Sequence, residues 1–420
     1  MAPSAVRAVT DRHLRWALMA LLFAVSMIAY ADRQILALLK PVLDRLMGWH
    51  SGDYGTMTTA FQASVAGMLV FAGWLVDKVG VRAGYAIGLG GWSLAATLHA
   101  ACRTVGQFTG ARAMLGGFEA IGLPAGIKAV AVFFPQEQRG LMMGVLNMAP
   151  NIAAMTTPLL ASALYSAVGW KWTIALIGAS GFACLAVWLA LPLRRLEQNA
   201  ALPVAGPLLR DGPLLREGSV LRDRGTWAVA AAKLLSDQAW WFFLFWLPDF
   251  FHRRYGLDMR HLGPPVAAIY AMAAGGALLG GLATDRLARR IGMDRPRARR
   301  AVMGAAALLV LPIAFVPHVG GLWTAVGVVG LGLAAHQAFS TNVFAFAGDW
   351  FSPARLGRAI SFGALCGNLG GTATLWLAGR LIATPADFQW MFLGCALGYP
   401  LAWLMMQALV PAGRQAVRAA

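Results

Sequence analysis

Charged side chains are scarce in this sequence of 420 residues: Asp, Glu, Lys and Arg together make up only 13% of it. Soluble domains carry about 25% charged residues and about 45–50% apolar ones. Here 59% of the residues are hydrophobic, so a soluble enzyme, a disordered chain and a coiled coil all fit the composition poorly. The scarcity of charge therefore predicts a membrane protein.

Cysteine is scarce as well. The four cysteines lie far apart in apolar stretches, at Cys102, Cys184, Cys366 and Cys395. They form no CxxC pair, disulfide framework or zinc-type spacing, and we interpret them as small core residues. No small-residue cleavage site follows the first apolar stretch, so no cleaved signal peptide is expected. We expect neither a metal ion nor a cofactor.

Long apolar stretches dominate the sequence. A helix that spans a bilayer needs about 20 mostly apolar residues, and twelve such stretches are present. They cover residues 14–36, 54–76, 83–102, 106–130, 140–165, 170–192, 226–251, 262–284, 301–317, 321–347, 357–382 and 388–410. The pattern predicts an all-α membrane protein with twelve transmembrane helices.

One long polar stretch, rich in Pro, Gly and Arg, separates the sixth span from the seventh. We interpret it as a linker between two six-helix halves. The predicted order is an N-terminal segment, a first half, a linker, a second half and a tail, over residues 1–13, 14–192, 193–225, 226–411 and 412–420.

The two halves repeat a short motif. The pattern Gly-x-x-x-Asp-basic begins at Gly73 after the second span and again at Gly281 after the eighth, 208 residues later. Its charged members are Asp77 with Lys78, and Asp285 with Arg286. Two copies of one six-helix unit suit a transporter whose site lies between the halves near the membrane midplane. A channel or a membrane-embedded enzyme does not predict this repeat.

The basic residues indicate the orientation. Of the 35 Lys and Arg residues, 22 fall on the side of the membrane that holds both termini and 7 fall on the other side. Cytoplasmic loops collect Lys and Arg, so both termini are expected in the cytoplasm. The bias also accounts for the net charge of +17 without a nucleic-acid partner. The basic cluster at 295–300 is interpreted as a topology anchor that meets anionic lipid.

A few ionisable residues lie inside predicted spans, where charge is costly and usually functional. Asp32 and Arg33 point in different directions because adjacent helix residues lie about 100° apart, whereas Tyr30 and Arg33 share a face. Arg112 and Glu119 are almost two full turns apart and also share a face. Plain ion pairs between or at the ends of helices are one interpretation. We favour cavity-lining groups that bind substrate and protons.

Polar stripes mark several other apolar helices of both halves. Their members include Gln62, Asn147, Asn151, Trp241, His336, Gln337, Ser340, Thr341, Asn368 and Thr372. Interhelical hydrogen bonding would account for any one of them. Together they predict a shared hydrophilic cavity in which hydroxyls, amides and aromatic faces suit a polyhydroxylated acid. An arginine would hold its carboxylate with two hydrogen bonds.

The loop Gly73-x-Leu-x-Asp77-Lys78-x-Gly80-x-Arg82 resembles the signature loop of the major facilitator superfamily. Further runs resemble the anion:cation symporter family within it, most closely its bacterial hexuronate transporters. They are Tyr-Ala-Asp-Arg-Gln at 30–34, Gly-Gly-Phe-Glu-Ala at 116–120, Lys-Leu-Leu-Ser-Asp at 233–237 and the aromatic run at 240–248. The resemblance covers nearly the whole chain except the termini and the linker.

This resemblance implies the major facilitator fold, with two pseudo-symmetric halves, and proton-coupled uptake of a sugar acid. By motif position, Arg33 would bind the substrate carboxylate, Asp32 and Glu119 would couple protons, and Arg112 would be the partner of Glu119. Two polar groups of the hexuronate pattern are missing. The run 120–124 lacks its amide, and 61–65 lacks its phenol.

The sequence thus predicts a proton-coupled symporter that imports a small organic anion, with a hexuronate or related sugar acid favoured. The predicted substrate-binding residues are Tyr30, Arg33, Gln62, Asn147, Trp241, Gln337, Ser340, Thr341 and Asn368. The predicted gating residues are Gly73, Asp77, Arg82, Asp285 and Arg286, and Asp77 is expected to meet the start of the eleventh span.

We expect a multi-pass monomer in the bacterial inner membrane, whose partners are the anion, protons and lipid. The alternative is an exporter or antiporter of organic acids on the same fold. An enzyme or a receptor is disfavoured because the sequence shows no nucleophile motif, metal-ligand cluster or added soluble domain.

Overall fold

The computed structural model describes residues 3–193, 196, 220–351 and 353–410. Within these ranges all regular secondary structure is helical, which confirms the predicted fold class. Most of the predicted linker, at 197–219, and the predicted tail at 412–420 lie outside the described residues. The end of the predicted linker, at 220–225, forms η2 and the start of α7.

The first half consists of long helices joined by short turns. Its elements are α1 (Pro3–Met47), α2 (Ser51–Val79), α3 (Val81–Leu98), η1 (His99–Ala101), α4 (Val105–Phe133) and α5 (Gln136–Ala190). Helix α5 is two rods across a kink at Gly169, whose φ of 74° departs from helical geometry. Glycine reaches positive φ without a Cβ clash, so this residue makes the turn between the expected fifth and sixth spans.

The second half repeats the plan. Its elements are η2 (Val220–Arg222), α7 (Arg224–Tyr255), α8 (Gly263–Ile291), α9 (Arg295–Val310), η3 (Leu311–His318), α10 (Leu322–Trp350), α11 (Pro353–Leu381), η4 (Pro385–Asp387) and α12 (Phe388–Leu409). Several helices extend beyond the apolar stretches that predicted them. Helix α1 continues to Met47 because backbone hydrogen bonding does not stop where hydropathy falls.

Length and composition agree with a membrane setting. Within the described ranges, 8 helices are long and apolar enough to cross a membrane. One of them, Glu137–Ala190, has 54 residues. At 1.5 Å per residue it is about 80 Å long, which is enough for two crossings of a hydrocarbon core about 30 Å thick.

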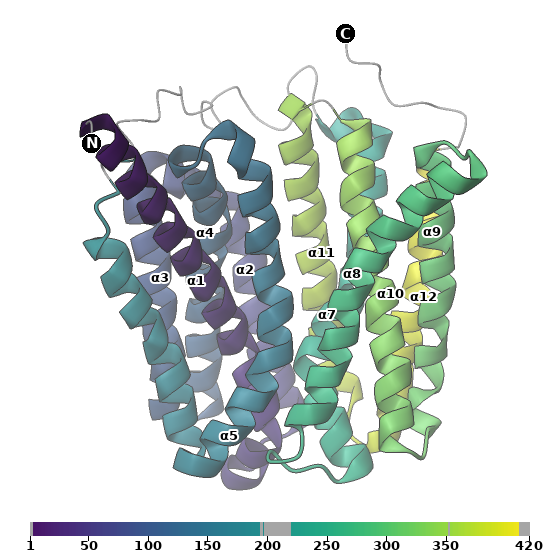
Figure 1. Ribbon diagram of the computed structural model, residues 1–420. Helices are drawn as coiled ribbons and strands as arrows, with labels where there is room; N and C mark the ends of the chain where they lie inside the picture. The colour runs from purple at the N-terminus through teal and green to yellow at the C-terminus, as the bar shows by residue number, and fades with distance from the viewer. Residues whose placement is uncertain (1–2, 194–195, 197–219, 352, 411–420) are drawn as a thin grey trace.

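The two halves stand side by side as separate bundles (Figure 1). Helix α1 begins at the upper end of this view, and the helices then alternate in direction. We call the end at which α1 begins the terminal face, and the opposite end the distal face. The turns at 48–50, 102–104 and 256–262 lie on the distal face, whereas Gly80 and 292–294 lie on the terminal face.

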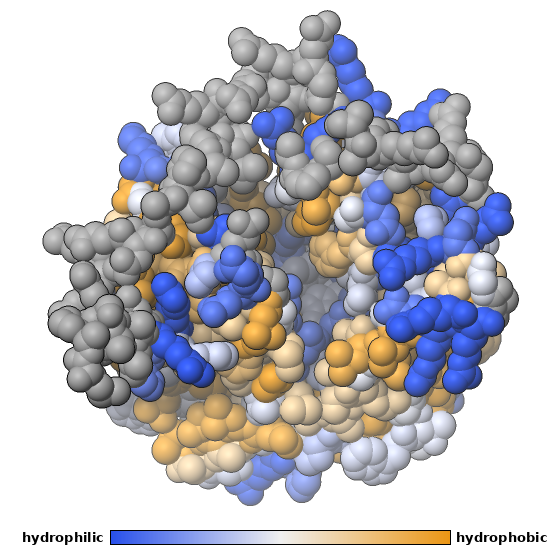
Figure 2. All heavy atoms as spheres, turned by 45° about the horizontal axis from the view of Figure 1, so that its top comes forward, coloured by the Kyte–Doolittle hydropathy of each residue, from blue (hydrophilic) through white to orange (hydrophobic). Residues whose placement is uncertain are grey.

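A hollow separates the halves on the terminal face, which Figure 2 turns toward the viewer. Across the middle of the molecule, α2 packs on α11, α5 on α8, and α1 on α7. Near the distal face the approach is closest at Gly55 and Gly379, where a Cβ on either residue would collide with the backbone of the other. Ser162 also donates to the carbonyl oxygen of Met259 at 2.8 Å. The hollow is therefore open to the terminal face and closed to the distal face.

Candidate functional site

Arg33 of α1 and Glu119 of α4 form an ion pair in the first half. The Arg33 Nε atom lies 2.6 Å from Glu119 Oε2, and the two side chains are 14% and 0% exposed. Hydrogen bonds between charged groups are about twice as strong as neutral ones. Arg33 and Asp32 do not pair with each other, as the 100° offset between adjacent residues predicts.

Aromatic rings from both halves surround the Arg33 guanidinium. Its carbon lies 4.7 Å from the ring centre of Tyr30, 5.7 Å from that of Phe61 and 5.7 Å from that of Trp241. Each distance falls within the range of cation–π attraction. Trp241 belongs to α7, so the second half contributes directly to the surroundings of Arg33.

Arg112 occupies a different position from the one expected. Its side chain is buried, and its Nη1 atom donates to the backbone oxygen of Asp32 at 3.3 Å. The partner of Glu119 is therefore Arg33 rather than Arg112, although Arg112 and Glu119 share a helix face. The difference arises because α1 crosses α4 near Glu119 and brings a second arginine to it.

Two amide pairs join the halves near the middle of their helices. Gln62 of α2 donates to Asn368 of α11 at 2.6 Å, and Gln337 of α10 donates to Asn151 of α5 at 2.7 Å. Three of these four amides were predicted as substrate-binding residues. The structure brings them to the boundary between the halves, where their amide groups currently bond each other.

The second half has its own buried charge pair, which sequence reasoning did not assign. Lys233 lies 2.8 Å from Asp237 and donates to Ser340 at 3.3 Å. The i,i+4 spacing of Lys233 and Asp237 was the available signal. Among the described residues, the side chains of Asn147 and Thr341, two predicted substrate-binding residues, make no hydrogen bond or ion pair.

His336 lies deeper in the second half. Its Nδ1 atom is 2.6 Å from the Tyr399 hydroxyl, which donates in turn to the Ser236 carbonyl oxygen at 3.0 Å. The Trp240 ring stacks on the imidazole with 5.4 Å between centroids. This is the arrangement of a core histidine, with Nδ1 hydrogen-bonded and the ring stacked on a neighbour.

On the terminal face, Asp77 pairs with Lys128 of α4 in the same half. Among the described residues this is its ion-pair partner, and the expected contact with the start of α11 stays a prediction for a state closed on this face. In the present state the open hollow keeps the two halves apart on this face.

The other predicted gating residues make local contacts. Arg82 donates to the Leu189 carbonyl oxygen at 2.7 Å, and Asp285 lies 3.8 Å from Arg289, four residues further along α8. Arg286 is exposed, and a Cβ added to Gly73 would meet no atom within 4 Å. None of these four residues reaches the opposite half in this state.

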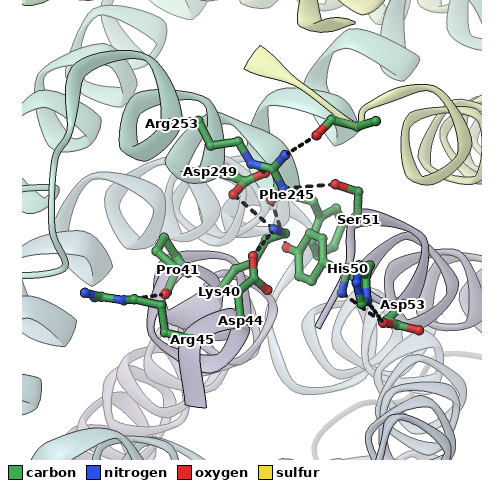
Figure 3. Close-up of polar contacts among 12 residues, drawn as sticks. Lys40, Pro41, Asp44, Arg45, His50, Ser51, Asp53, Phe245, Asp249 and Arg253 are labelled. Atoms are coloured by element: carbon green, nitrogen blue, oxygen red, sulfur yellow. Dashed lines mark hydrogen bonds and ion pairs between the residues drawn. The ribbon is translucent and has the colours of Figure 1, made fainter. Parts of the chain in front are cut away.

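A cluster of four charges joins the halves near the distal face (Figure 3). Lys40 Nζ of α1 lies 3.0 Å from Asp249 Oδ1 of α7 and 2.6 Å from Asp44 Oδ2. Arg253 Nε lies 3.0 Å from Asp249 Oδ2, and its Nη2 atom donates to Ser51 of α2 at 2.9 Å. We call Lys40, Asp44, Asp249 and Arg253 the distal cluster.

The centre of the distal cluster is buried, since the side chains of Lys40 and Asp249 are 0% and 1% exposed, whereas those of Asp44 and Arg253 are 21% and 20% exposed. The Tyr54 hydroxyl donates to the Phe245 carbonyl oxygen beside it at 2.8 Å. Sequence reasoning did not predict this cluster. Its signal was a pair of i,i+4 ion pairs, Lys40 with Asp44 and Asp249 with Arg253, at the distal ends of α1 and α7.

The model of the Major Facilitator Superfamily matches residues 22–346 of this chain. The chain belongs to the Major Facilitator Superfamily. It is a transport protein and not an enzyme. Among the residues that the structure describes, no group of three or more His, Cys, Asp or Glu side chains could hold a metal ion.

Curated relatives of this facilitator transport sugar acids. The chain is 24% identical to the hexuronate transporter of Escherichia coli over 408 residues, which cover 94% of each chain. It is 24% identical to the galacturonate transporter of Dickeya chrysanthemi over 71% of this chain and 89% of that protein.

The fold also matches a solved structure, a bacterial homologue of the human lysosomal transporter Spinster in an inward-facing, unoccupied conformation. The TM-score is 0.78 at 14% identity, with 95% of this chain and 99% of that chain covered. At this identity the likeness concerns the fold alone.

Proposed function

We propose that this facilitator imports a hexuronate or a related sugar acid together with at least one proton, by alternating access. The observation that supports this most directly is the buried ion pair between Arg33 and Glu119 at the boundary of the halves. Arg33 would bind the substrate carboxylate, and Glu119 would carry the proton.

Charge balance couples the two events. Glu119 pairs with the Arg33 guanidinium when no substrate is bound, so an incoming substrate carboxylate competes with Glu119 for Arg33. Two carboxylates on one buried arginine would leave one of them unpaired, and an uncompensated buried charge costs about 3–5 kcal/mol. Protonation of Glu119 removes that cost. Substrate and proton binding would then favour each other equally, as thermodynamic linkage requires.

The remaining groups suit the rest of a sugar acid. The amides of Gln62, Asn368 and Gln337 and the hydroxyl of Ser340 can exchange their present partners for the hydroxyls of the substrate. The faces of Tyr30 and Trp241 lie beside the guanidinium and would cover the apolar side of a sugar ring. Asp32, next to Arg33 and bonded through its backbone to Arg112, would be the second proton-coupling residue.

The orientation follows from charge. The terminal face carries most of the arginines, so it would be the cytoplasmic face of a bacterial inner membrane. The present state would then be open to the cytoplasm, and the distal cluster would keep the outer side closed. Asp77 would leave Lys128 and meet the start of α11 when the terminal face closes. A monomer contains every group that this cycle uses.

The test is transport of labelled D-glucuronate by purified protein in lipid vesicles. We expect accumulation when the distal side is acidic and alkalinisation of that side as substrate enters. Glu119→Gln should retain exchange of substrate across the membrane but lose accumulation, because an empty carrier could not discharge its proton. The exposed Glu137→Gln is the matched control and should behave like the parent.

Each alternative gives a different result. An antiporter, including an exporter driven by protons, would move protons in the direction opposite to that of the substrate. Accumulation by Glu119→Gln equal to that of the parent would make Glu119 a structural charge and contradict the assignment.

A further inference from the structure

A small cavity lies inside the first half, away from the hollow. Helices α1, α3, α4 and α5 enclose it together with η1, and its polar lining consists of Asp32, His99 and Arg112. The space open to the centre of a water molecule is about 10 Å³. A single water needs about that much room and two to four polar partners.

Each of the three polar residues that line this cavity has a buried atom without a hydrogen-bond partner. Asp32 Oδ2, His99 Nε2 and Arg112 Nε are buried and have no hydrogen-bond partner among the described residues. The residues themselves are 2%, 3% and 1% exposed. Buried polar groups are nearly always hydrogen-bonded, to protein or to water. Three orphaned atoms around a space the size of one water therefore point to a bound water.

The tautomer of His99 is fixed by its other nitrogen. His99 Nδ1 lies 2.7 Å from the Ala95 carbonyl oxygen. A carbonyl oxygen can only accept a hydrogen bond, so Nδ1 carries the hydrogen and Nε2 of the neutral ring keeps a free lone pair. The cavity thus has an acceptor on His99, a donor on Arg112 and a carboxyl group on Asp32.

The cavity lies on the distal side of the coupling residues. Helix α3 ends at η1 on the distal face, and His99 is the first residue of η1. Arg112 is seven residues nearer the distal end of α4 than Glu119, which is about 10 Å along the helix. His99, the cavity, Asp32 and Glu119 therefore follow one another from the distal face toward the hollow, within the first half.

We propose that His99 and this water form a proton route to Asp32 through the first half, separate from the substrate route between the halves. This inference rests on the proposed proton coupling. In the state that is open on the distal face, a proton from that side binds His99 Nε2, since the ring is buried in the present state. The water then accepts that proton from Nε2 and gives one of its own to Asp32 Oδ2, which restores the neutral ring.

The surroundings of His99 suit a transient carrier. The charged and titratable groups that face it are Asp32 from α1 and Arg112 from α4, whereas Ala96 of α3 and Ile174 of α5 are apolar. The Phe108 ring packs edge-on against the imidazole, and Trp49 packs on Phe108. The positive charge of Arg112 opposes a lasting charge on His99, so the proton passes on to Asp32.

His99→Gln tests the route, because glutamine keeps a polar side chain of similar length but cannot relay a proton. In vesicles we expect D-glucuronate exchange within about twofold of the parent and proton-driven accumulation slower by at least about tenfold, a loss typical of a missing acid–base group. The loss should grow as the distal side becomes less acidic. His318→Gln is the matched control, since this exposed histidine ends η3 on the same face of the other half.

A second variant tests the water without changing the histidine. Ile174→Phe enlarges another residue of the cavity lining, so it should displace the water and slow proton-driven accumulation while exchange continues. Unchanged accumulation in both variants, beside a proton-coupled parent, overturns the route and leaves the proposed function intact. If uptake by the parent protein does not depend on the pH gradient, the proposed function is contradicted, and this inference with it.

Discussion

Lys40 and Asp249 form an ion pair across the boundary between the two halves, with 3.0 Å between Nζ and Oδ1. Both side chains are buried, and each also meets a charge on its own helix, Asp44 and Arg253 respectively. The pair can exist only while the distal ends of α1 and α7 touch. It therefore favours the state that is closed on the distal face.

Asp249→Asn should shift the molecule toward the state that is open on the distal face. The change leaves Lys40 buried with one acidic partner instead of two, and breaking a buried pair costs about 3–5 kcal/mol. Because 1.4 kcal/mol is a factor of ten, we expect at least about a tenfold rise in labelling of a Ser162→Cys reporter by an impermeant maleimide. The reporter needs a background without the four native cysteines.

The double variant Lys40→Met with Asp249→Leu is the control for this interpretation. Replacing a buried ion pair with apolar residues of similar volume is often neutral or stabilising. Reporter labelling in the double variant should therefore fall back toward the parent level. Lys40→Met alone and Asp249→Leu alone complete the cycle. If labelling of the double variant rises by the product of the rises in these two single variants, Lys40 and Asp249 do not act as a pair.

Gly55→Ala should oppose closure of the distal face by simple crowding. A Cβ on Gly55 would meet the backbone of Gly379, so α2 and α11 must separate there. Gly67→Ala on the same helix is the matched control, because nothing lies within 4 Å of its added Cβ. Only Gly55→Ala should raise reporter labelling. Equal labelling in both variants would mean that the contact between Gly55 and Gly379 takes no part in closing the distal face.

The fold was predictable because the bilayer constrains the backbone. Every peptide group inside lipid must bond within its own helix, so long apolar stretches map directly onto helices. The repeat of Gly73 and Gly281 then divided the helices into two halves. Gly169 lies in the short gap between the expected fifth and sixth spans, so the apolar stretches also located this turn, although the helix assignment runs on through it.

Pairing between distant segments was not predictable. The spacing of Arg112 and Glu119 placed both on one face of α4, yet the partner of Glu119 is Arg33, 86 residues away. The spacing of residues shows which side chains share one face of a helix, but it does not show which helices pack against each other. The same limit applies to Lys40 and Asp249, which are 209 residues apart.

Asp77→Asn should slow transport far more than it weakens substrate binding. Asp77 pairs with Lys128 while the terminal face is open, and we propose that it meets the start of α11 when that face closes. We expect a transport rate lower by about tenfold, equivalent to about 1.4 kcal/mol on the barrier. The affinity for D-glucuronate, measured by titration calorimetry, should stay nearly constant. An equal loss of rate in Lys128→Met would assign the effect to the present pair instead.

Arg33→Lys should lower the affinity for D-glucuronate by at least about tenfold, although it keeps the positive charge. Arginine presents a planar fork that matches a carboxylate with two hydrogen bonds and stacks on rings, whereas lysine offers a compact point charge. The ring centres of Tyr30 and Trp241 lie 4.7 Å and 5.7 Å from the guanidinium carbon, so the variant would lose that stacking. Thermal stabilisation by D-glucuronate measures the change, because a ligand that binds only the folded state raises its stability. Stabilisation equal to that of the parent would mean that another cation holds the carboxylate. Lys233 would then be the next residue to test, since it lies across the boundary with Asp237 and Ser340.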